Sequence, residues 1–159
     1  MIRIEDMSET QRQSWITLLA DGAIFIWFWQ KMTHGLSLQV VHNNIEEFGA
    51  LIIRVIIITL ILHAIIAAIF DLRKRKESYE KDERDIQIEN EGAHAGYRVY
   101  YFGIGGIIFM MFAHIWLGKD YTPTFSIRTP VEIIFALMMV SYAADLIKHG
   151  VMIRAYRGA

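Results

Sequence analysis

The chain has 159 residues, of which 54% are hydrophobic and 13% aromatic, and its formal net charge is −1. Soluble domains average about 45–50% apolar residues, so this composition favours a protein that exposes apolar side chains to lipid. The near-neutral charge argues against a nucleic-acid partner, which requires surplus Lys and Arg, and the absence of cysteine excludes disulfides and thiolate ligands.

Four segments are long and apolar enough for a helix that crosses a bilayer, which needs about 17 to 25 residues. They cover residues 14–31, 48–70, 97–117 and 131–152. The first is the shortest and contains Asp21, but it lacks the basic start and the small-residue cleavage pattern of a signal peptide. The remaining segments are then a head (1–13), two outer loops (32–47 and 118–130), a charged middle segment (71–96) and a tail (153–159).

The distribution of Lys and Arg predicts the orientation of these spans. Basic residues are concentrated in the middle segment, and the positive-inside rule places such segments in the cytoplasm. Four spans bring both termini to that same side. We therefore expect an all-α protein of the prokaryotic cytoplasmic (inner) membrane, with four transmembrane helices in an up-down bundle and both termini cytoplasmic.

The charged middle segment, "RKRKESYEKDERDIQIENEGAHAG" (73–96), contains alternating charges of both signs. Glu77 and Lys81 are four residues apart, the spacing that brings opposite charges together on a helix. This pattern predicts a cytoplasmic helical hairpin between spans two and three, turning near Ser78. Its expected role is docking of a partner, through residues Asp82, Glu83, Arg84 and Asp85.

Small residues follow at helical spacing. Gly92, Gly96, Gly103 and Gly106 form one side of the predicted third helix. In lipid, small residues allow helices to approach closely and pack. We expect this side to contact another helix, within the chain or in a homo-oligomer.

Residues 82–97, "DERDIQIENEGAHAGY", resemble a signature of small prokaryotic multi-span membrane proteins of unknown function. The resemblance lies in an Asp-Glu-Arg-Asp segment, a following isoleucine, small residues four apart and a tyrosine that opens a span. It implies an accessory role, such as that of companions of small transcription regulators or of export and immunity systems. The matching residues are Asp82, Glu83, Arg84, Asp85, Ile88, Gly92, Gly96 and Tyr97.

Ionisable residues within the spans define two predicted polar layers. Asp21, His63 and Asp145 each lie about seven residues from the inner end of a span, which is a depth of roughly 10 Å. They predict either a protonatable site or mutually satisfied groups that fix the helix register, with separate placements at the lipid edge as the third alternative. Arg54, His114 and Glu132 form the outer layer, in which we expect an Arg54–Glu132 ion pair.

Sequence motifs for an enzyme, a phosphate loop or a cofactor are absent. His63 and His114 lie at different depths, which disfavours a haem, and the outer His34 and His42 have no compact ligand spacing, so we expect no metal and no cofactor. We predict a non-enzymatic, oligomeric accessory or regulatory membrane protein. A small proton- or ion-coupled transporter or an oligomeric channel is the alternative.

Overall fold

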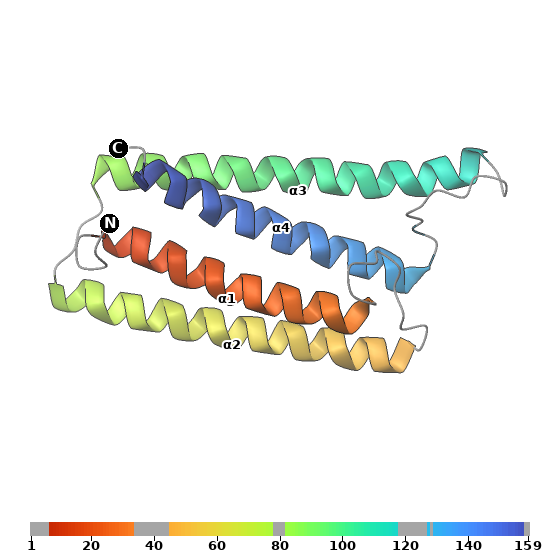
Figure 1. The fold of residues 1–159 in the computed structure, drawn as a ribbon, viewed down its shortest axis with the longest axis horizontal. Coiled ribbons are helices and arrows are strands. Elements are labelled where there is room, and N and C mark those ends of the chain that lie inside the picture. The colour runs from red at the N-terminus through yellow and green to blue at the C-terminus, as the bar shows by residue number, and fades with distance from the viewer. Residues whose placement is uncertain (1–6, 34–44, 78–81, 118–126, 128, 158–159) are drawn as a thin grey trace.

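The computed structural model describes residues 7–33, 45–77, 82–117, 127 and 129–157, which form four α-helices. These are α1 (Glu9–Met32), α2 (Ile45–Glu77), α3 (Glu83–Leu117) and α4 (Pro130–Arg157). Successive helices run in opposite directions, and the two termini lie at the same end as the connection between α2 and α3 (Figure 1). We call this the terminal end of the molecule.

The sequence provides capping residues where three of the helices begin. The Ser8 hydroxyl accepts from the amide of Gln11 at the start of α1, at 3.2 Å. The Asp82 carboxylate accepts from the amide of Asp85 at the start of α3, at 2.7 Å. At the start of α4, Thr129 and Glu132 each accept from the other's amide, at 3.2 and 2.8 Å, which is a capping box. These bonds satisfy amides that have no partner within the helix.

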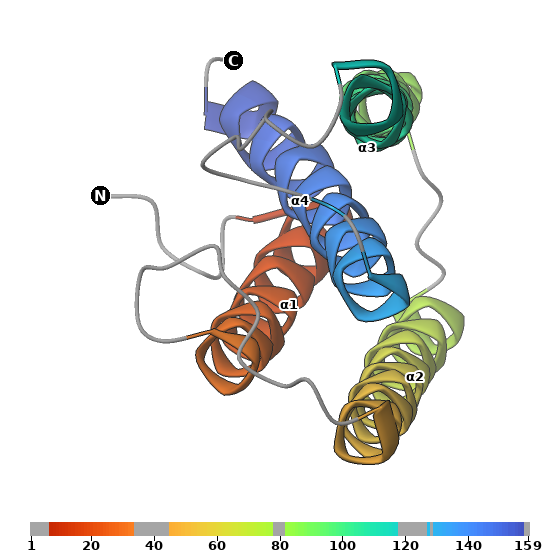
Figure 2. The same ribbon diagram turned by 90° about the vertical axis from the view of Figure 1, so that its right-hand side faces the viewer.

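Helix α4 occupies the centre of the arrangement. It packs most extensively on α3 and also on α1, and α1 in turn packs on α2. Seen end-on, α3 lies on one side of α4, whereas α1 and α2 lie on the other (Figure 2). Among the described residues, the consecutive helices α2 and α3 share no extensive interface.

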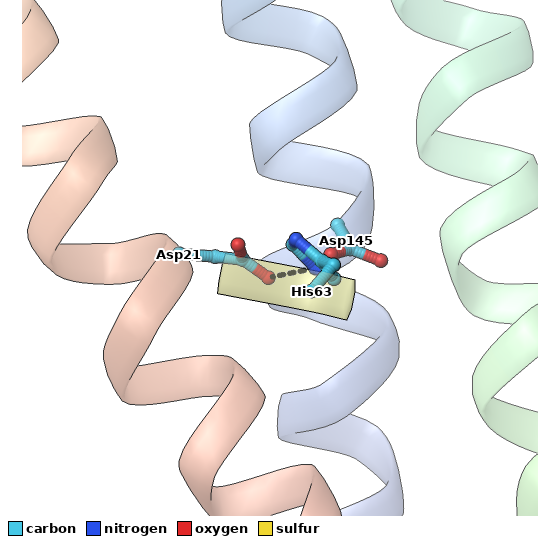
Figure 3. Close-up of side chains that lie close together, drawn as sticks. All are labelled: Asp21, His63 and Asp145. Carbon is cyan, nitrogen blue, oxygen red and sulfur yellow. Dashed lines mark ion pairs between the residues drawn. The ribbon is translucent and has the colours of Figure 1, made fainter. Parts of the chain in front are cut away.

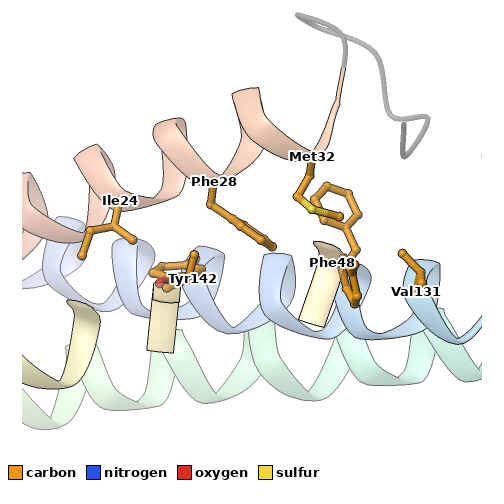
Figure 4. Close-up of a cluster of buried hydrophobic side chains, with 8 residues drawn as sticks. Ile24, Phe28, Met32, Phe48, Val131 and Tyr142 are labelled. Carbon is orange, nitrogen blue, oxygen red and sulfur yellow. The ribbon is translucent and has the colours of Figure 1, made fainter. Parts of the chain in front are cut away.

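The largest apolar core among the described residues lies between α1, α2 and α4 (Figure 4). Most of its residues belong to the end of α1 and the beginnings of α2 and α4, which lie away from the terminal end. Phe28 and Phe135 are almost completely buried, with ring centroids 5.6 Å apart. Met32 and Val55 are also fully buried. Tyr142 marks the edge of this core that faces the terminal end, toward the predicted inner polar layer.

Three helices, α2, α3 and α4, are long and apolar enough to cross a membrane. They expose large apolar side chains, including Leu60, Phe102 and Phe109 at 65%, 72% and 70%. Helix α3 also shows that the charged residues from Glu83 onward and the apolar segment 97–117 belong to one helix. The predicted turn near Ser78 lies outside the described residues.

Candidate functional site

The structure brings the side chains of the predicted inner layer together (Figure 3). Asp21 comes from α1, His63 from α2 and Asp145 from α4, and one ligand-type atom of each lies within 4.8 Å of the others. The closest pair is His63 Nε2 and Asp21 Oδ2, at 3.4 Å. We call these three residues the inner cluster.

The hydrogen bond of His63 to its own helix defines which ring nitrogen faces the cluster. Nδ1 lies 2.9 Å from the carbonyl oxygen of Thr59 and must donate, because a carbonyl can only accept. Nε2 therefore faces the Asp21 carboxylate. Lone pairs that face each other at 3.4 Å repel, so this position suits a proton or another cation shared by the two groups.

Burial is unequal within the inner cluster. The Asp21 side chain is 2% exposed, and within the described part of the chain neither carboxylate oxygen has a hydrogen-bond partner. The side chains of His63 and Asp145 are 38% and 36% exposed. Both line a cavity of about 390 Å³ between α2 and α4, to which Asp21, Thr59, Ser141 and Tyr142 also contribute. The cluster thus has one buried carboxylate and two groups that can meet a ligand.

His149 is a neighbour of the inner cluster that the sequence interpretation did not include. It lies one helical turn after Asp145, and its Nε2 is 3.8 Å from Asp145 Oδ1. It also lines a second cavity of about 330 Å³ between α1, α3 and α4, together with Gln13, Glu89 and Lys148. The four-residue spacing was the available sequence signal, because it places both side chains on one face of a helix.

The structure describes the predicted outer layer only in part. Arg54 is exposed, and no ion pair joins it to Glu132 among the described side chains. Glu132 accepts from the Thr129 amide in the capping box of α4. The outer layer therefore stays a prediction, and the described contact of the Glu132 carboxylate is the cap of α4. The side chain of His114 lies outside the described ones.

The predicted docking residues have two different placements. Glu83 and Arg84 are exposed, and Asp82 caps α3. Asp85 is only 3% exposed, because it accepts hydrogen bonds from the hydroxyls of Tyr156 in α4 and, at 3.4 Å, of Ser8 before α1. Asp85 thus ties three helix ends together and is not available for a partner.

Three of the four predicted packing glycines lie against α4. A Cβ atom added to Gly92, Gly96 or Gly103 would lie 2.5 to 2.9 Å from an atom of α4, closer than atoms pack. Gly106 has no such neighbour within 4 Å. Close packing therefore extends along α3 from Gly92 to Gly103 and holds α3 to α4.

Comparison of the chain with protein family models, with curated proteins and with solved structures finds no match.

Proposed function

We propose that this chain is a four-span protein of the prokaryotic cytoplasmic membrane that acts as a non-enzymatic accessory or regulatory subunit, with its terminal end in the cytoplasm. Three apolar helices support the membrane assignment. The fourth span and the regulatory role rest on the observations below. The proposed orientation rests on the concentration of Lys and Arg in the middle segment.

The side-chain pattern of α1 supports its role as the fourth span. Its polar residues Ser14, Thr17 and Asp21 are buried at 1%, 5% and 1%. Its apolar Leu19 and Ile26 are 66% and 56% exposed. A helix in water has the reverse pattern, with polar residues outside. Polar groups inside and apolar groups outside favour an environment of lipid.

One observation carries the choice of a regulatory role over transport: the apolar core closes the space between α1, α2 and α4 beyond the inner cluster. Among the described residues, polar side chains line the space from the terminal end through His149 to the cluster, and Thr59 and Tyr142 lie next to the apolar core. Past that point lie the buried Phe28, Phe135 and other members of the core. A transport path needs polar contacts from one face to the other, whereas a site open to one side suits sensing or regulation.

The terminal end of α3 offers a surface for a partner. The side that faces α4 is buried at Asp85, Ile88 and Gly92, whereas Glu83 and Gln87 on the other side are exposed. With the orientation proposed, this charged side projects into the cytoplasm. It is the docking surface that we assign to a partner membrane protein or to a second copy of the chain.

The alternative function is that of a proton- or ion-coupled transporter, and the ionisable residues of the inner cluster are the reason to consider it. Flux measurements in proteoliposomes distinguish the two functions. We expect vesicles containing the chain to dissipate a pH, sodium or potassium gradient no faster than protein-free vesicles. An Asp21→Asn variant provides the matched control. If vesicles with the parent show flux and vesicles with the Asp21→Asn variant do not, the protein is a transporter and the proposed regulatory function is wrong.

A further inference from the structure

We propose that Asp21, His63 and Asp145 bind a divalent transition-metal cation, for which Zn²⁺ fits best, and that the cation reaches them from the terminal end past His149. The inference concerns binding alone and stands whether or not the accessory role is correct.

The spacing of the three side chains suits such an ion. Zn²⁺ binds His nitrogen and carboxylate oxygen at about 2.0 to 2.2 Å, so neighbouring ligand atoms of a tetrahedral site lie roughly 3.3 to 3.6 Å apart. The contact between His63 Nε2 and Asp21 Oδ2 is already 3.4 Å, and all three ligand atoms lie within 4.8 Å. Small side-chain rotations of the two more exposed residues, His63 and Asp145, would complete three corners of the site.

The surroundings orient the ligands as metal sites require. A metal-binding histidine usually donates its other ring nitrogen to a carbonyl or carboxylate, and His63 Nδ1 donates in this way to Thr59. Asp145 has His149 as its own neighbour at 3.8 Å. The fourth coordination position faces the cavity of about 390 Å³, where water or a hydroxyl can occupy it.

The two carboxylates supply a further reason, because one divalent cation can compensate the charge of both. Asp21 is 2% exposed, and both of its oxygens lack a hydrogen-bond partner within the described residues. A buried carboxylate without a hydrogen bond is costly, and coordination to a metal would supply that interaction.

The ligand types discriminate between cations. Mg²⁺ and Ca²⁺ prefer six to eight oxygen ligands, whereas this cluster provides one imidazole nitrogen and two carboxylates. Imidazole favours Zn²⁺ and its neighbours in the first transition row. Entry is possible through the cavity of about 330 Å³, whose polar lining includes Gln13, Ser14, Glu89 and His149. Lys148 also lines it, so the entrance is not uniformly attractive to cations.

Binding is tested on the purified full chain in nanodiscs after treatment with a chelator. Calorimetric titration with Zn²⁺ and the visible spectrum of added Co²⁺ are the two measurements. We expect one cation per chain and Co²⁺ bands typical of four or five ligands. His63→Gln and Asp21→Asn should each weaken binding at least about 100-fold, which is the upper range of the loss from orienting residues alone.

The matched control is His94→Gln, because His94 is exposed on α3 and far along the chain from the cluster. It should bind as the parent does. Circular dichroism and gel filtration check that each variant folds. If the Asp21→Asn variant does not fold, the binding measured for the His63→Gln variant decides, because His63 is the more exposed residue. The proposal is overturned if the parent binds neither ion, which leaves a cluster that holds only protons, or if His63→Gln binds like the parent.

Discussion

Replacement of Gly96 by alanine tests the packing of α3 on α4 with a single methyl group. An added Cβ at this position would lie 2.9 Å from the carbonyl oxygen of Ala144 and 3.1 Å from Cβ of Lys148. Atoms in good contact are about 3.5 Å apart, so the two helices must separate by roughly 0.5 Å or deform. The closest obstacle is backbone, which cannot move aside as a flexible side chain can.

The expected cost follows from two opposing effects. Overpacking typically costs about 1–3 kcal/mol, whereas Gly to Ala within a helix gains about 0.5–1 kcal/mol. The net loss for Gly96→Ala is therefore about 0–2.5 kcal/mol. For a chain of this length each kcal/mol corresponds to about 2–4 °C, so the Tm should fall by up to about 10 °C.

Gly106→Ala is the matched control, because it adds the same methyl group to the same helix with no atom within 4 Å. Its Tm should stay at the parent value or rise slightly. Thermal unfolding of all three proteins in one mild detergent, followed by circular dichroism, measures the difference. Equal Tm values for the two variants would show that α3 does not pack on α4 through Gly96.

The remaining predictions concern orientation, the junction of helix ends and the cap of α4. Because the chain has no cysteine, single cysteines placed at Ser78 and Ser126 report the topology. On intact cells an impermeant thiol reagent should label the Ser126→Cys variant and not the Ser78→Cys variant. The reverse labelling would show that the orientation is inverted. Tyr156→Phe removes the hydrogen bond to the buried Asp85 and should lower the free energy of unfolding by about 1.5–3 kcal/mol in denaturant titrations. An unchanged free energy would show that this hydrogen bond does not hold the helix ends together. Thr129→Ala should cost about 0.5–2 kcal/mol through loss of the capping box, and a parent-like unfolding curve would show that the cap contributes nothing.

That the residues of the inner cluster lie at one level of the helix bundle could be predicted from the sequence. A helix rises 1.5 Å per residue, so residue counts from the ends of the predicted antiparallel spans give comparable levels. This is why Asp21, His63 and Asp145 could be assigned to one layer. The count does not give the direction in which each side chain points, and the structure was needed to show that all three converge.

Contacts between chain ends could not be predicted in the same way. Asp85 belongs to a run of charged residues that is typical of a solvated surface, yet it is buried because Ser8 and Tyr156 reach it from distant parts of the chain. Such contacts depend on how the helices pack and not on local spacing. The Glu132 carboxylate shows the opposite case, because its capping role was readable from Thr129 three residues before it.

The glycines of α3 show that helical spacing alone does not predict which residues contact a neighbouring helix. Gly92, Gly96, Gly103 and Gly106 follow one side of α3, but only the first three contact α4 closely. Toward the end of α3 away from the termini the two helices diverge (Figure 1), and large side chains such as Trp116 are exposed. Spacing predicted the face of the helix, whereas the crossing of the helices decided how much of that face is used.

Photocrosslinking in native membranes tests the central claim, that the terminal end of α3 docks a partner. A benzoylphenylalanine placed at Gln87, on the exposed side of α3, should give a discrete protein adduct, whose mass separates a second copy from a different partner. The same group at Phe109, which is 70% exposed in the apolar part of the helix, is the control and should give no such adduct. Absence of a protein adduct at Gln87, or the same adduct at both positions, would contradict the accessory role.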